Sequence, residues 1–253
     1  MGTDIILFCT GIVVGNMNAI AGGGGLVGFP VLLWVGLPAL TADATSFLAV
    51  LPGQVASAFG YRKYLARVPK VYLLLLIPAA AGAAIGSHLL KHTSFAGFEK
   101  IVPLLILASV LIFALQPLLH FHLMQHIRSR HKSALKLVLL GLAVFVMTIY
   151  GGYFGVGLGF AILALLGFTN LHEIHMLNGM KNVAAAVVVT VALVSVYGAH
   201  IIHWRYGLVV AVGNLIGGYT GARIAQKVSS HAIRVVVIAI GLTTASYLAW
   251  HYH

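Results

Sequence analysis

Two glycine clusters are the features of this sequence best suited to bind a solute. They are Gly22-Gly23-Gly24-Gly25 and Gly151-Gly152-Tyr153-Phe154-Gly155, and each lies within a long uncharged, apolar stretch. Because consecutive glycines destabilise a helix, we expect each cluster to interrupt one. The freed backbone N–H groups and the positive ends of the half-helices would then form a concavity that binds an anion. The alternative is that the glycines only allow close helix packing.

Polar side chains near both clusters are the candidate partners of that anion. Lys181 leads them, because a cation among uncharged residues and opposite glycine-rich backbone attracts an anion. The alternative for Lys181 is extension to the membrane interface. Replacing Lys181 with alanine is expected to weaken anion binding without unfolding the protein. The expected substrate-binding residues are Asn18, Gly22, Gly23, Gly24, Gly25, Thr45, Ser46, Gly151, Gly152, Tyr153, Asn178, Lys181 and Asn182.

Two acidic residues follow the turns after the expected half-helices. They are Asp43 and Glu173. Either they are plain loop residues or one of them carries a coupling proton, and we favour the loop interpretation for both.

Histidine offers a second chemistry. The chain has 13 histidines, with His172 and His175 at a spacing that places both on one face of a helix. Such pairs can bind zinc, which would suit a carrier of divalent cations. Most of the histidines fall in expected loops without carboxylates, so we predict no metal site. The sequence also lacks the motifs of hydrolases, metalloproteases and phosphate-binding loops, which predicts a protein that is not an enzyme and needs no cofactor.

The composition indicates the setting for these residues. Of 253 residues, 60% are hydrophobic and 8% are charged, against about 25% charged in soluble domains. This excludes a water-soluble globular protein and predicts an all-α integral membrane protein whose partner is the lipid bilayer. The net charge of +11 reflects Lys and Arg in cytoplasmic loops rather than nucleic-acid binding.

The stretches between charged residues predict about eight helical segments. They are 5–42, 44–60, 71–90, 101–121, 137–171, 183–199, 207–222 and 235–250. The first and fifth would reach about 50 Å or more as single helices, well beyond a bilayer core of about 30 Å. Each of these two must break or fold back at its glycine cluster.

The order of features is the same in both halves, which predicts two homologous four-segment repeats. We expect the first membrane repeat at 1–119, a basic, His-rich linker at 120–136 and the second repeat at 137–253. If the broken segments cross the membrane, the repeats are parallel; if they are re-entrant, the repeats are inverted. We favour inverted repeats by analogy with other transporters. Small-residue faces, Gly82 with Gly86 and Gly217 with Gly221, either pack the halves together or join two copies into a homo-oligomer.

Several stretches resemble the TauE/SafE family of sulfite exporters. They are GGGGLVGFPVLLWVGLP at 22–38, ATSFLA at 44–49, GYRK at 60–63, GGYFG at 151–155 and MKN at 180–182. The resemblance implies a multi-pass carrier in the inner (plasma) membrane for sulfite, sulfonates or thiosulfate, driven by a proton or sodium gradient. The sequence departs from the family at Trp204, which an acidic residue often precedes, and this leaves the substrate and the coupling ion open. The alternatives are the divalent-cation carrier and a membrane scaffold that transports nothing.

Overall fold

All the regular structure is helical in the part of the chain that the computed structural model describes, residues 2–126, 134–169, 171 and 173–225 with isolated positions 243 and 246. The α-helices are α1 (Gly2–Ile20), α2 (Gly25–Trp34), α3 (Ala39–Gly60), α4 (Arg62–Leu65), α5 (Leu76–Lys91), α6 (Phe95–His126), α7 (Ala134–Tyr153), α8 (Leu158–Leu166), α9 (Ile174–Val196) and α10 (Trp204–Ile224). Two 3-10 helices, η1 (Lys70–Leu75) and η2 (Tyr197–Ala199), precede α5 and follow α9.

Four described segments are long and apolar enough to cross a membrane. They are Gly2–Ile20, Lys70–Lys91, Leu135–Tyr153 and Ile174–Ala199. The predicted segment 235–250 lies outside the described residues. Helix α6 continues to His126, into the stretch predicted as a linker, and residues 127–133 of that stretch also lie outside the described part.

The first glycine cluster breaks its helix as predicted. Helix α1 ends at Ile20, and residues 21–24, here called the first break, precede α2. Gly22 has a φ of +100°, a left-handed conformation that glycine adopts without strain. Its N–H bonds to the carbonyl of Met17 at 2.9 Å, which closes the end of α1. Helix α2 then folds back along α1, as the contact of Gly28 with Val14 shows.

The second glycine cluster also interrupts its helix as predicted, at the C-terminal end of the cluster. Gly151 and Gly152 remain in the last turn of α7, and the irregular residues are 154–157, here called the second break. The break therefore includes Gly155 of the predicted cluster but not Gly151 and Gly152. A side chain on Gly152 would collide with the backbone of Ala83 in α5, so this glycine serves close packing. Gly157, with a φ of +83°, is the residue that turns the chain into α8.

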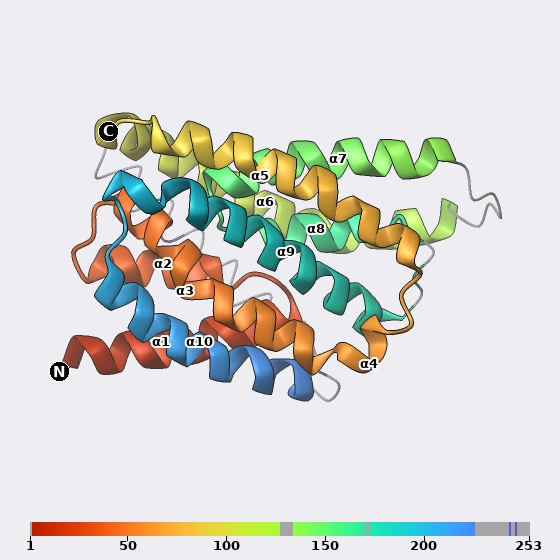
Figure 1. Cartoon of the computed structure of the whole chain (residues 1–253), viewed down its shortest axis with the longest axis horizontal. Helices are drawn as coiled ribbons and strands as arrows, with labels where there is room; N and C mark the ends of the chain where they lie inside the picture. The colour runs from red at the N-terminus through yellow and green to blue at the C-terminus, as the bar shows by residue number, and fades with distance from the viewer. Residues whose placement is uncertain are drawn as a thin grey trace.

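The helices form two groups, and each group contains helices from both halves of the chain. The halves are the residues before and after 127–133. Helices α1 and α3 of the first half pack against α10 of the second, whereas α7 and α9 of the second half pack against α5 of the first. Helix α9 also contacts α3 and so joins the two groups, and α1 and α7 run in opposite directions (Figure 1).

The small-residue faces account for this arrangement. Side chains on Gly82 and Gly86 would collide with the backbone of α7, and side chains on Gly217 and Gly221 would collide with that of α1. Glycine at these four positions lets the helix backbones touch. Both faces therefore pack the halves together within one chain, which leaves neither free to join two copies.

Candidate functional site

The two break regions, each taken together with the first turn of the helix that follows it, touch in the interior of the fold. A methyl group on Gly22 would come within 2.7 Å of the backbone carbon of Gly159, and one on Gly159 within 2.6 Å of the carbonyl oxygen of Gly22. A methyl group on Gly25 would come within 3.1 Å of the Cα of Val156. Glycine is required here because each break lies directly against the first turn of the helix that follows the other break.

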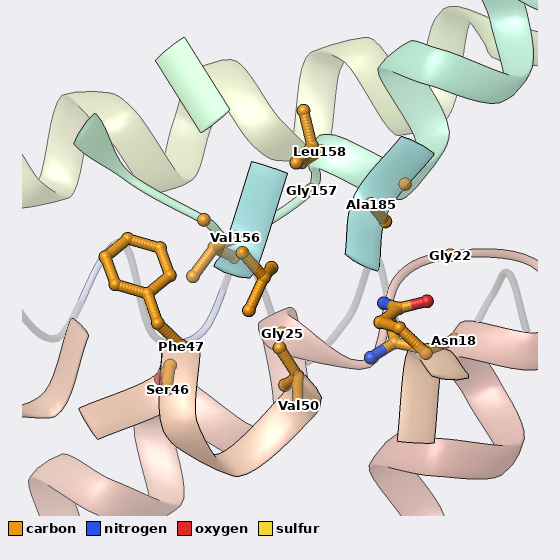
Figure 2. Close-up of a pocket in the computed structure, with 14 residues that line it drawn as sticks. Asn18, Gly22, Gly25, Ser46, Phe47, Val50, Val156, Gly157, Leu158 and Ala185 are labelled. Atoms are coloured by element: carbon orange, nitrogen blue, oxygen red, sulfur yellow. The ribbon is translucent and has the colours of Figure 1, made fainter. Parts of the chain in front are cut away.

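A small cavity of about 30 Å³ lies at this contact. That volume holds a water molecule. Figure 2 shows Asn18 and Gly22 from the first break region, Ser46, Phe47 and Val50 from α3, and Val156 and Leu158 from the second break region around it. The complete lining is Asn18, Gly22, Gly25, Ser46, Phe47, Val50, Gln54, Gly155, Val156, Gly157, Leu158, Gly159, Ala185 and Val189.

Several residues of the lining carry hydrogen-bond donors without acceptors. The N–H groups of Gly25, Leu158 and Gly159 lie in the first turns of α2 and α8 and donate to no acceptor among the described residues. The side chain of Asn18 accepts from the N–H of Gly24 at 2.9 Å, which leaves its amide NH₂ free to donate. Helix N-termini carry a partial positive charge as well as free donors. The lining therefore suits an anion.

Lys181 lies behind the first break rather than in the cavity. Its side chain is 1% exposed, and its ammonium group donates to the carbonyl of Asn18 at 2.7 Å and to the side chain of Asn178 at 3.1 Å. The carbonyl of Ala19 is a third acceptor at 3.5 Å. These carbonyls belong to the last turn of α1, where a cation is stabilised by the helix dipole. Lys181 thus fixes the residue whose side chain lines the cavity.

Asp43 occupies the comparable place behind the second break. It lies inside α3 and is 0% exposed, so the prediction that it is a loop residue is wrong. The backbone amide of Gly155 is directed toward its carboxyl group, although neither carboxyl oxygen makes a hydrogen bond of good geometry within the described residues. Glu173, by contrast, pairs with Arg67 at 3.1 Å with much of both side chains exposed, as expected of a loop residue.

The remaining predicted residues fall into two groups. Asn18, Gly22, Gly25 and Ser46 line the cavity. The others lie outside the lining and have local roles: Gly23 packs on Phe160 and Gly24 on Val14; Thr45 accepts from the N–H of His203 at 2.9 Å; Gly151 packs on Leu158; the hydroxyl of Tyr153 bonds to Thr93 at 3.2 Å; and Asn178 accepts from Lys181. Asn182 is 0% exposed, and its side chain has no partner in the described part.

Sequence reasoning missed most of the second break's contribution. Gly155, Gly157 and Gly159 all line the cavity, and glycine at every second position from 155 to 159 was the available signal. Gln54 also lines the cavity, and its side-chain oxygen has no partner among the described residues. A polar residue in the middle of an apolar segment could have indicated it. No sequence signal singled out Phe47 or Ala185.

The described histidines do not form a metal site. No group of three His, Cys, Asp or Glu side chains converges within the described residues. His175 packs against the rings of Tyr61 and Tyr64, and His203 accepts from the backbone N–H of Tyr206 at 3.3 Å. His172 and the side chains of the histidines between 120 and 131 lie outside the described part.

Known proteins similar to this chain are membrane transporters. The family model described as "Sulfite exporter TauE/SafE" matches residues 7–248. A "Probable membrane transporter protein" of Haemophilus influenzae is 31% identical, over 99% of this chain and 96% of that protein. The "Probable membrane transporter protein ORF9" of a Sinorhizobium species is 29% identical, over 94% of this chain and 89% of that protein. The "Probable membrane transporter protein YfcA" of Escherichia coli is 26% identical, over 98% and 90%. No solved structure matches the chain.

Proposed function

The chain belongs to the sulfite exporter TauE/SafE family of membrane transporters, and from this premise we propose that it carries small sulfur-containing anions of the sulfite, sulfonate or thiosulfate type. It is a multi-pass membrane protein and not an enzyme. In the proposal it lies in the plasma membrane and couples anion movement to an ion gradient.

The observation that supports the proposal is the set of unused donors on residues where the two break regions meet. Gly25, Leu158 and Gly159, whose N–H groups lack acceptors among the described residues, line one cavity together with Asn18, whose amide NH₂ is free. Backbone donors at helix N-termini recognise an oxyanion, whereas a divalent cation would need several oxygen or nitrogen ligands. Among the described lining residues only Gln54 has a buried side-chain oxygen without a partner, so a divalent-cation carrier is the weaker candidate for this cavity.

The small cavity supports a closed state in this proposal. Its volume of about 30 Å³ suits water, so the proposal requires the two breaks to move apart before a larger anion enters. Because the breaks belong to different halves of the chain, relative motion of the halves opens the site.

We interpret the halves as inverted repeats that alternate access to this site. The opposite directions of α1 and α7 (Figure 1) support inversion over a parallel arrangement, and the folding back of α2 along α1 agrees with it. In transporters with inverted repeats, substrates bind at the repeat interface near the bilayer midplane, between broken helices. In the proposal, the contact between the two break regions is that substrate site.

Flux into proteoliposomes tests the function. Purified protein is reconstituted and given radiolabelled sulfite, thiosulfate, sulfoacetate, sulfate or chloride, with zinc as the cation control, with and without an imposed ion gradient. We expect saturable counterflow of at least one sulfur anion and none of zinc. Zinc movement alone, or no movement of any solute by folded protein, would contradict the proposal.

Asn18→Asp tests the cavity itself. The substitution keeps an oxygen to accept from Gly24 but replaces the free amide donor with a negative charge. We expect anion affinity to fall by about tenfold or more, because a charge-assisted hydrogen bond worth about 1.5–3 kcal/mol is lost. Asn16→Asp is the matched control, since Asn16 bonds within its own helix to Ile12 at 2.9 Å and does not line the cavity. Equal effects of the two substitutions would remove Asn18 from the site.

A further inference from the structure

We propose that Asp43 carries the proton that this transporter couples to its anion, an inference that rests on the proposed function. The side chain is 0% exposed and lies in α3. Within the described residues no Lys, Arg or His pairs with it, and neither carboxyl oxygen has a hydrogen-bond partner. An ionised carboxylate in such a place costs many kcal/mol. Binding a proton removes that cost without a counter-ion.

Asp43 contacts the wall of the cavity from behind. The backbone amide of Gly155 is directed toward the carboxyl group, and Gly155 itself lines the cavity. Phe47, one turn after Asp43 in α3, also lines the cavity and packs against Gly155. Residues four apart lie on one face of a helix, so the acid and the ring approach the second break together. Gly155 therefore links the region of the carboxyl group to the proposed anion site.

This placement links the proton to the anion. Two negative charges on either side of Gly155 repel each other, and both would draw on the donors of the second break. An anion therefore binds best when Asp43 is protonated, and by thermodynamic linkage the bound anion favours the protonated acid to the same degree. Anion and proton then bind together and leave together, which is symport.

Among the residues that the structure describes, no other charge near Asp43 substitutes for the proton. Tyr150 of α7 is the titratable group that faces Asp43, and its hydroxyl is held by the carbonyl of Val156 at 2.9 Å and by Ser109. On α9, Lys181 is bonded to Asn18 and Asn178. Helix α2 contains no titratable residue. The other charged groups of the helices packed against α3 are paired with each other or lie near helix ends: Asp4, Arg62, Lys63, Glu99, Lys100, Arg205 and Arg223.

The proton step is a transfer between oxygens. A hydronium ion on one side of the membrane loses the proton, its O–H bond breaks, and an O–H bond forms on a carboxylate oxygen of Asp43; on the other side this O–H bond breaks and a water molecule accepts the proton. The anion occupies the cavity while that O–H bond exists. No oxidant, reductant or cofactor takes part.

The test measures anion counterflow and proton movement in the same proteoliposomes. The probes are thiosulfate and sulfoacetate, because neither changes charge between mildly acidic and neutral pH, and a pH-sensitive dye is enclosed in the lumen. For the unmodified protein we expect an imposed thiosulfate or sulfoacetate gradient to move protons in the same direction as the anion. For Asp43→Asn we expect counterflow to persist, while proton movement and accumulation driven by a pH gradient fall by at least about tenfold. Glu173→Gln is the acidic control, because Glu173 forms an exposed ion pair with Arg67. This substitution should leave counterflow, proton movement and pH-driven accumulation unchanged.

Two results would overturn the inference. One is unchanged proton movement in Asp43→Asn. The other is net anion flux down an imposed gradient in the unmodified protein without any proton movement, which decides the question even if the variant does not fold. Absence of counterflow for every anion in the unmodified protein is a different result, because it contradicts the proposed function and this inference falls with it.

Discussion

Replacing Lys181 with methionine should destabilise the protein as well as weaken anion binding. Methionine keeps the length of the side chain and removes the ammonium group. That group donates to the carbonyl of Asn18 at 2.7 Å and to the side chain of Asn178 at 3.1 Å, and its side chain is 1% exposed. The sequence alone predicts a loss of affinity without unfolding. The contacts add a structural role for Lys181, because its ammonium group donates to backbone carbonyls in the last turn of α1.

The expected magnitude follows from the acceptors that remain. Asn18 and Asn178 each lose a donor, whereas the carbonyl of Ala19 keeps the hydroxyl of Tyr61 at 3.2 Å. A buried acceptor without a partner costs about 1–3 kcal/mol, so two cost about 2–6 kcal/mol. Removing a buried cation returns part of this, since its desolvation is also avoided. We expect a net loss of about 2 kcal/mol, or about 30-fold in the folding equilibrium.

Reversible unfolding in mixed micelles, followed by tryptophan fluorescence, measures this loss. Lys91→Met is the matched control, because Lys91 is an exposed residue at the end of α5 and should change stability by less than about 0.5 kcal/mol. A double-mutant cycle with Asn178→Ala should show coupling of about 1.5–3 kcal/mol for the charged hydrogen bond. Equal stability of the two lysine variants, with no coupling to Asn178, would refute the argument that Lys181 fixes α1.

Two further predictions concern the contact between the break regions. Gly159→Ala should abolish counterflow and lower the melting temperature, because its methyl group would lie 2.6 Å from the carbonyl oxygen of Gly22. The control is Gly198→Ala, which has nothing within 4 Å of the added methyl group and should match the unmodified protein. Normal flux in the Gly159→Ala variant would mean that the break regions need not touch. Ala185→Leu should reduce counterflow by more than about tenfold at a stability cost of about 1–3 kcal/mol, because it fills the cavity. Ala186→Leu, on the side of α9 that faces an apolar groove, is its control, and similar flux in the two leucine variants would argue against the cavity as the route.

The first break was predictable because its cause is local. Four consecutive glycines leave a helix without side chains to stabilise it, and Gly22 adopts a conformation suited to glycine. The same rule does not predict which residues of the second cluster stay helical. Gly151 and Gly152 each cost a helix about 1 kcal/mol, but they stay helical because Gly152 packs against Ala83 in a helix far away in the sequence. The tertiary contact outweighs the local preference.

The environments of the two key charges also depend on distant contacts. Lys181 was recognisable as a charge within an apolar segment, but its partner at Asn18 lies 163 residues away. Asp43 was assigned to a turn because it follows Pro38. Helix α3 begins at Ala39, so Asp43 is a helical residue, and its carboxyl group lies near the second break. The sequence identifies both residues as unusual, and only the fold shows which break each one contacts.

Asp43 and Lys181 each lie in one half of the chain and contact the other half. Asp43 belongs to the first half and contacts Gly155 in the second break, whereas Lys181 belongs to the second half and contacts the end of α1 beside the first break. Any motion of one half against the other therefore changes the positions of an acid and a cation relative to the cavity at the same time. A substrate can shift a conformational equilibrium only if it binds the two states with different affinity. In the proposed mechanism Lys181 and the protonation of Asp43 each affect the anion through the break of the opposite half, so opening the site changes the electrostatic potential at the anion, which supplies that difference.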